Sequence, residues 1–179
     1  MACQGARSRS RDAGWPLLAA ALLALSLRLA RQDVARRTVR KRGLTRFIAV
    51  CLLSGYAWLA LGAIALLAGG TDYGSAAWDA GLNAVMLGFV FSMVFGHASI
   101  IFPAVTRAAV PYHWRFYLPL ALLHLSLALH IGGGLAGMTN LRQAGGATNA
   151  LALLLFARST ISAVVRGKLA VRRDAGRLG

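Results

Sequence analysis

Residues 47–71 read FIAVCLLSGYAWLALGAIALLAGGT and contain no Asp, Glu, Lys or Arg. An uninterrupted apolar run of about 20 residues crosses the hydrocarbon core of a bilayer as a helix, whereas a soluble chain would interrupt such a run with polar faces. Residues 80–106 and 116–141 are likewise free of acidic and basic side chains. Residues 143–165 contain only Arg158. The sequence therefore predicts an all-α, polytopic transmembrane helix bundle with four spans.

A fifth, shorter span is predicted near the N-terminus. Uncharged residues 13–27 follow the basic stretch RSRSRD (residues 7–12) and are interrupted by Arg28. This arrangement resembles a signal peptide, but either cleavage or an inside N-terminus would leave the most basic segment of the chain outside. We therefore expect a short or truncated span whose N-terminus lies outside.

The distribution of charge predicts the orientation of the spans. Arg28 and residues 31–46 carry eight of the 20 Lys and Arg residues, whereas residues 69–79 carry none. Short loops rich in Lys and Arg stay on the cytoplasmic side, which predicts a multi-pass inner-membrane protein with connection 107–115 inside and 137–145 outside. The predicted division of the chain is a basic N-terminus with a short span (1–30), a basic cytoplasmic loop (31–46), a four-helix transmembrane domain (47–165) and a basic cytoplasmic tail (166–179).

The net charge of +15 does not indicate a nucleic-acid partner. The basic residues gather in loops beside the spans, where they favour anionic lipid headgroups. We therefore expect the lipid bilayer and its anionic headgroups as partners, and no nucleic acid.

Motifs of common enzyme classes are missing from the sequence. It contains no phosphate-binding loop, no G-x-S-x-G and no carboxylate pair within the spans, so nothing indicates a hydrolase or a nucleotide-binding enzyme. Cys3 and Cys51 form no C-x-x-C motif and imply neither a disulfide framework nor covalent haem attachment. Cys51 lies inside an apolar run and is interpreted as a small packing residue.

Small and helix-breaking residues predict how the spans pack and end. Small side chains let a neighbouring helix backbone approach closely. Pro103 is expected to end or kink the third apolar run, Gly132–Gly134 to weaken the fourth, and the last span to begin near Gly146. Two small-residue stripes on consecutive spans are Cys51, Gly55 and Gly62, then Gly88, Ser92 and Gly96.

Two histidines within the spans are candidate metal ligands. A histidine in a membrane is costly and is interpreted first as functional. His97 lies roughly 8 Å from the inner end of its span and His124 roughly 12 Å from the inner end of the next, at 1.5 Å per residue. Because the two antiparallel helices bring them to comparable depth, His97 and His124 could share a metal or a haem iron, since imidazole suits copper, iron and zinc alike.

Three further polar residues are candidates for cofactor or polar contacts. His130 lies near the outer side at about the level of Asn83 on the neighbouring span. Arg158 either extends to the inner headgroups or pairs with an anionic group such as a haem propionate.

The alternatives for the histidines stay open at this point: helix packing through hydrogen bonds, a metal or haem site, or a route for protons or a polar solute.

The third and fourth spans carry a family resemblance. Residues 82–105 (LNAVMLGFVFSMVFGHASIIFPAV), residues 110–131 (VPYHWRFYLPLALLHLSLALHI) and residues 148–157 (TNALALLLFA) resemble the C-terminal half of uncharacterised bacterial multi-span membrane proteins related to the NnrS family. The resemblance covers residues 25–160 and is most specific around 93–105.

This resemblance implies a haem- or copper-associated membrane protein linked to nitric oxide or respiratory stress. It implicates His97 and His124, and it also matches His113 at the membrane edge. Relatives commonly have His at the position of Asn83, and an amide is a poor metal ligand. Because the relatives are longer, the resemblance also implies that the chain is a fragment lacking an N-terminal half. The alternative function is that of a non-catalytic membrane component, either a transporter part or an assembly subunit. A second copy of the chain, in a homo-oligomer, is expected as a further partner.

Overall fold

The structure is a computed structural model that describes residues 2–69, 72–106 and 114–175. Within these ranges it is built from helices and contains no strand, which confirms the prediction of an all-α transmembrane bundle. The elements are α1 (Ala2–Gln32), α2 (Ala35–Thr38), α3 (Leu44–Gly69), α4 (Ala76–Asn83), the π-helix η1 (Ala84–Val90), α5 (Phe91–Thr106), the 3₁₀ turn η2 (Trp114–Phe116), α6 (Tyr117–Leu135) and α7 (Thr139–Ala175).

Four helical segments within the described residues are long and apolar enough to cross a membrane: Gly14–Gln32, Leu44–Gly69, Ala76–Phe102 and Trp114–Leu135. Three of them correspond to predicted apolar runs. The first, Gly14–Gln32, includes the N-terminal run for which only a short span was expected. The predicted span 143–165 lies inside α7, and its role as a span stays a prediction.

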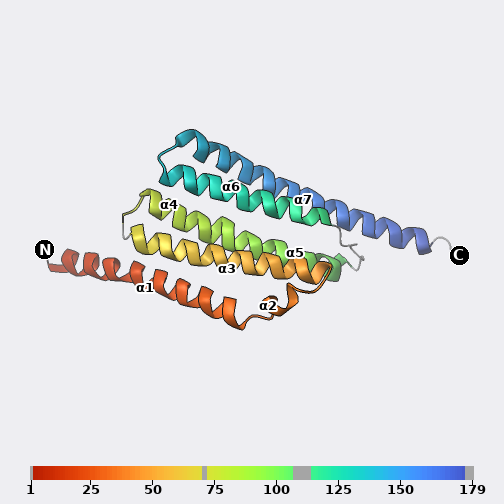
Figure 1. Cartoon of the computed structure of the whole chain (residues 1–179), viewed down its shortest axis with the longest axis horizontal. Helices are drawn as coiled ribbons and strands as arrows, with labels where there is room; N and C mark the ends of the chain where they lie inside the picture. Colours follow the sequence, from red (N-terminus) through yellow and green to blue (C-terminus); the bar gives the residue numbers. More distant parts are fainter. Residues whose placement is uncertain (1, 70–71, 107–113, 176–179) are drawn as a thin grey trace.

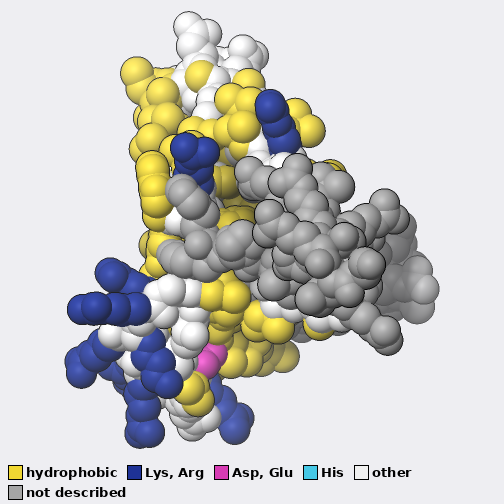
Figure 2. All heavy atoms as spheres, turned by 90° about the vertical axis from the view of Figure 1, so that its right-hand side faces the viewer, with side chains coloured by type: hydrophobic (Ala, Val, Ile, Leu, Met, Phe, Trp, Pro, Cys, Tyr) yellow, Lys and Arg dark blue, Asp and Glu magenta, His cyan; other side chains and the backbone are white. Residues whose placement is uncertain are grey.

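The helices lie side by side and pack as two groups (Figure 1). Helices α1, α3 and the α4–η1–α5 span form one group, and α6 with α7 forms a helical hairpin beside it. The turns at 72–75 and 136–138 lie at the same end, which we call the outer end from the predicted orientation. Figure 2 shows the opposite, inner end, where Lys and Arg side chains gather over the side formed by α1 and α2.

The predicted small-residue stripes face each other across α3 and the third span. A Cβ atom at Gly62 would lie 3.0 Å from the carbonyl oxygen of Gly81, and one at Gly96 would lie 3.2 Å from the Cβ of Cys51. Such spacing leaves no room for larger residues, so these stripes set the approach of the two helices. The packing prediction is confirmed, and Cys51 is fully buried as expected.

The third span is irregular in its middle. It passes from α4 into the seven-residue π-helix η1 and then into α5, which continues to Thr106. Of the two outcomes predicted at Pro103, a helix end is therefore wrong. Proline is tolerated in transmembrane helices because neighbouring groups satisfy the freed backbone. A π-helical turn inside a helix frequently marks a functional position.

The helix boundaries around the last two predicted spans differ from the bounds of the apolar runs. Helix α6 includes Gly132–Gly134, where the span was expected to weaken, and ends one residue later, at Leu135. Gly137 has a φ of 69°, and the Met138 N–H donates to the carbonyl oxygen of Gly133 (2.8 Å), a hydrogen bond typical of a Schellman helix end. Helix α7 then starts at Thr139, so the expected loop 137–145 is mostly helix.

Helix α7 also continues past the predicted tail boundary, to Ala175. The tail is rich in Ala, Arg and Lys, which are strong helix formers in water. The basic residues from Arg166 onward mark the end of the apolar run. Basic side chains do not end a helix, so α7 continues through them.

Candidate functional site

His124 on α6 makes two hydrogen bonds to α3. Its Nδ1 accepts from Trp58 Nε1 (2.8 Å), and its Nε2 lies 3.0 Å from Ser54 Oγ. Because indole nitrogen only donates, Nδ1 of a neutral His124 must be the acceptor and Nε2 carries the proton. Ser54 Oγ in turn donates to the carbonyl oxygen of Cys51 (3.1 Å). Both ring nitrogens of His124 are therefore used in joining α6 to α3.

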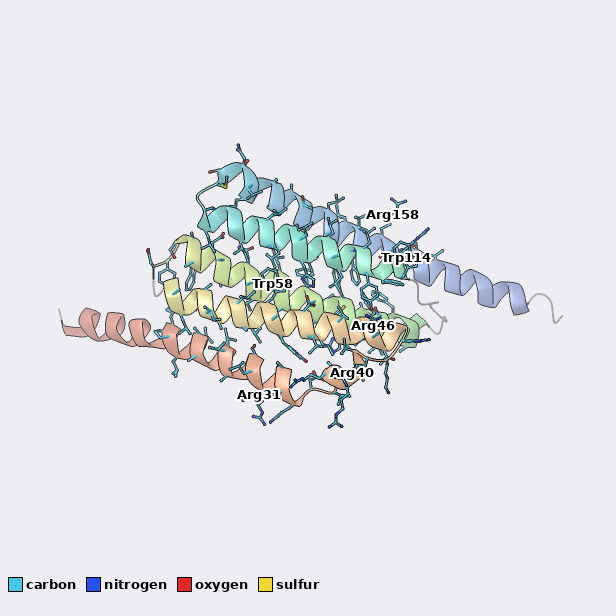
Figure 3. All side chains as sticks on the ribbon, in the orientation of Figure 1. Arg31, Arg40, Arg46, Trp58, Trp114 and Arg158 are labelled. Carbon is cyan, nitrogen blue, oxygen red and sulfur yellow. The ribbon has the colours of Figure 1, made fainter. Side chains whose placement is uncertain are left out.

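Trp58 lies between this histidine and the π-helix η1. Its ring lies nearly parallel to that of His124, with a centroid distance of 6.2 Å and an interplanar angle of 25°. On its other side, a Cβ atom at Gly88 would lie 2.5 Å from Trp58 Cβ and even closer to Cγ. The absence of a side chain at Gly88 thus creates the space that Trp58 fills, and Figure 3 shows Trp58 in the middle of the bundle.

His97 on α5 faces away from the bundle. Its side chain is exposed, and its Nδ1 lies 2.8 Å from the carbonyl oxygen of Met93 on the same helix. Since a carbonyl only accepts, Nδ1 donates this hydrogen bond and Nε2 of the neutral ring keeps its lone pair. Exposed Val94, Ile101 and Ala104 lie within about 60° of His97 around the helix, so the imidazole sits in the middle of an apolar face.

The structure therefore does not join His97 to His124 by any described contact. The ring of His124 faces α3, and the ring of His97 faces outward. A shared metal remains a prediction, and it would require His124 to break both of its hydrogen bonds.

A polar cluster at the outer end joins three helices. Asp79 on α4 accepts from Arg142 of α7 (Nη2 to Oδ2, 3.1 Å), and His130 Nε2 of α6 lies 3.7 Å from the same oxygen. Asn83 Nδ2 donates to the Asp79 carbonyl (2.8 Å). His130 Nδ1 donates to the Arg142 carbonyl (2.9 Å). The predicted common level of Asn83 and His130 is confirmed, with Asp79 between them.

A second polar contact, between α6 and α7, lies deeper in the bundle. The hydroxyl of Ser126 donates to Oδ1 of Asn149 (2.6 Å), and both residues are buried. Nδ2 of Asn149 has no hydrogen-bond partner within the described part of the chain. The pair adds to the contacts that hold the hairpin together.

Arg158 is exposed on α7 and lies toward the inner end, where Figure 3 also places Arg46 and Trp114. Within residues 2–69, 72–106 and 114–175, no ion pair or hydrogen bond connects Arg158 to His97, His124 or His130. Both predicted roles, contact with headgroups and pairing with a haem propionate, stay predictions. His113 lies outside the described residues.

Sequence reasoning missed Trp58, Asp79 and Arg142. A signal existed for Trp58, because tryptophan prefers the membrane interface and this one lies 14 residues past Leu44, in mid-span. Asp79 and Arg142 were counted as outer loop residues. Because both residues lie at the same predicted level of the membrane, an ion pair between the Asp79 carboxylate and the Arg142 guanidinium could have been predicted.

The described residues contain no group of three or more His, Cys, Asp or Glu side chains arranged to hold a metal ion. Residues 2–165 match a family described as Domain of unknown function (DUF8744). No curated protein and no solved structure matches the chain.

Proposed function

We propose that this chain, which belongs to the DUF8744 family, is a haem-associated protein of the inner membrane in which His97 supplies an iron ligand. The membrane location follows from the four apolar helical segments. The haem association rests on the environment of one imidazole.

The single observation that carries the proposal is the free Nε2 of His97. Hydrogen bonding of Nδ1 to the Met93 carbonyl fixes the tautomer and the ring orientation, and this is the arrangement that commonly prepares Nε2 for metal. Ionisable residues within membrane spans almost always face a bundle interior or a cavity. His97 instead faces outward, so a bound group covering this face would remove the cost of exposing an imidazole to lipid.

Haem fits this face better than copper. Copper sites in proteins use several nitrogen or sulfur ligands, whereas a haem is held by one or two axial ligands and rests on apolar side chains. Exposed Val94 and Ile101 flank His97 and provide such a surface. His124 is a poorer candidate because both of its nitrogens already have partners.

A haem bound at this face would supply a redox-active iron able to bind small diatomic ligands. The residues of this chain would hold its iron through His97 and its macrocycle through the apolar side chains of α5. The resemblance to NnrS-related proteins supports a link to nitric oxide or respiratory stress.

The test is an absorbance spectrum with metal analysis of the full chain purified from haem-replete cells. We expect a Soret band and bound iron, both lost in His97→Ala. Because His97 bonds only to its own helix, this substitution should leave the stability of the bundle unchanged.

The matched control is His124→Gln, which alters the other predicted ligand histidine and should keep the Soret band. Colourless, metal-free wild-type protein from haem-replete cells would contradict the proposal, as would a Soret band that persists in His97→Ala.

A second candidate function is a non-catalytic membrane component, such as a transporter part or an assembly subunit. It is favoured by the hydrogen bonds of His124, which join two helices and leave neither nitrogen free. In this case the polar residues of the spans serve packing.

A double-mutant cycle of Trp58→Phe and His124→Leu measures that packing role. We expect a coupling energy of about 0.6–1.7 kcal/mol in the free energy of unfolding, from the mean to the maximum of the couplings measured between transmembrane helices. Unfolding in mixed detergent with sodium dodecyl sulfate provides the measurement. Additive effects of the two substitutions would show that the contact contributes nothing.

The proposed partners follow from the surface of the bundle. Apolar helices place the chain in contact with the bilayer, and we propose that its basic inner segments contact anionic headgroups. We also propose a homo-oligomer, which light scattering of the purified protein tests.

A further inference from the structure

Helix α1 ends part-way along α3 instead of reaching its inner end. The hydroxyl of Ser26 donates to the Tyr56 carbonyl (3.1 Å), and the hydroxyl of Tyr56 donates to the Asp33 carboxylate just after α1. Tyr56 lies 12 residues, roughly 18 Å, from Leu44 at the start of α3, and α1 runs six residues, roughly 9 Å, beyond Ser26. Helix α1 therefore ends roughly 9 Å short of the inner end of α3. The segment from Val34 to Gly43 continues along the flank of α3 to its inner end.

A basic hollow forms where α1 meets α2. Its volume is about 600 Å³, and its lining residues are Arg31, Gln32, Asp33, Val34, Arg36, Arg37 and Arg40. We call it the arginine hollow. The side chains of Arg31 and Arg40 point away from the neighbouring helices in Figure 3, and Figure 2 shows basic side chains gathered on this side.

The one acidic side chain in the lining is already in use. Asp33 Oδ1 accepts from the backbone N–H of Ala35 (2.9 Å), and Oδ2 accepts from Tyr56. None of the four arginines forms an ion pair with an acidic side chain within the described ranges of the chain. The hollow thus concentrates positive charge that the protein itself does not neutralise.

We propose that the arginine hollow binds the phosphate of an anionic lipid headgroup. Guanidinium groups bind phosphate through paired hydrogen bonds, and four arginines line this one hollow. The hollow lies beside a membrane-spanning helix, so a lipid reaches it from the bilayer without leaving its leaflet. Exposed Val34 in the lining offers contact for the apolar part of that lipid.

This inference depends on the membrane location of the chain and not on haem. If the purified protein is colourless but retains anionic lipid, the proposed haem association fails and the lipid site stands. If a Soret band is present and no lipid preference is found, the reverse holds.

Native mass spectrometry of the full chain, titrated with phosphatidylglycerol or phosphatidylcholine, tests the proposal. We expect phosphatidylglycerol to bind and phosphatidylcholine to bind far more weakly. Arg36→Gln with Arg37→Gln should weaken phosphatidylglycerol binding about tenfold or more, because each basic residue near the surface contributes a substantial share of the attraction.

The matched control is Arg172→Gln with Arg173→Gln, which removes the same charge from the predicted inner side. It should change binding less than about twofold, since general surface attraction alone is spread over all basic residues. Equal losses in both pairs would overturn the site. So would displacement of the lipid by millimolar inorganic phosphate, which would identify a site for free phosphate.

A second double variant, Arg31→Gln with Arg40→Gln, tests the site in case the Arg36→Gln/Arg37→Gln variant fails to fold. These side chains point away from the bundle, so the helical circular dichroism should stay unchanged while lipid binding falls. Unweakened binding in this folded variant would contradict the proposal.

Discussion

Replacing Gly145 with alanine is expected to destabilise the bundle by about 2–3 kcal/mol, the upper range for overpacking a well-packed interior. A Cβ atom at this position would lie 2.5 Å from the backbone nitrogen of His130 and 2.8 Å from the Ser126 carbonyl oxygen. No side chain can rotate to make room, because the clashing atoms belong to the backbone of α6. The two helices must move apart, which strains the Ser126–Asn149 and His130–Arg142 hydrogen bonds.

The neighbouring residue provides the control for this prediction. A Cβ atom at Gly146 would meet only the ring of His130, at 3.5 Å or more, and this is an ordinary contact. Gly146→Ala should therefore be neutral, or stabilising by up to about 1 kcal/mol through helix propensity. Unfolding titrations of both variants in sodium dodecyl sulfate measure the difference. Equal stability of the two would show that α6 and α7 are not packed as described.

Gly88→Ala is expected to displace Trp58 and to lower the free energy of unfolding by about 2 kcal/mol, through overpacking and loss of a hydrogen bond. The new methyl group would overlap Trp58 at Cβ and Cγ, atoms too close to the α3 backbone to swing away. The indole must shift as a whole, so Nε1 loses its hydrogen bond to His124.

The fluorescence of Trp58 reports this shift directly. In a variant that keeps Trp58 as its only tryptophan, Gly88→Ala should change the emission maximum and the quenching by His124. Gly132→Ala serves as the control, since nothing lies within 4 Å of a Cβ atom there. An unchanged emission spectrum in Gly88→Ala would refute the close packing of Trp58 on η1.

The sequence was sufficient to predict three of the four long apolar helical segments, and the faces on which α3 meets the third span. Long apolar runs identify membrane helices because few other structures tolerate them. The stripes at Gly55 and Gly96 identified the packed faces because small residues in membranes permit close helix approach.

The exposed position of His97 could not be predicted in the same way. In a soluble helix the polar face marks the outside, but nearly every residue around α5 is apolar. The sequence therefore predicts how far along the helix His97 lies, but it does not predict to which side of the helix its ring points. The same limit explains why His97 and His124 were paired on depth alone.

The early end of α1 depends on two contacts that no local pattern encodes. Asp33 and Ser26 both bond to Tyr56, which lies at least 23 residues away in the chain. The π-helix η1 likewise reflects tertiary packing, since Ala84–Val90 carries no proline that would disturb a regular helix.

The hairpin of α6 and α7 has a consequence for how the protein assembles. A three-residue turn connects the helices, and Gly133 and Gly145 hold their backbones in contact on either side of it. Contacts this local in sequence form quickly and need no other part of the chain. The hairpin is therefore expected to form early, and the stacked rings of Phe156 and Phe95 join it to α5.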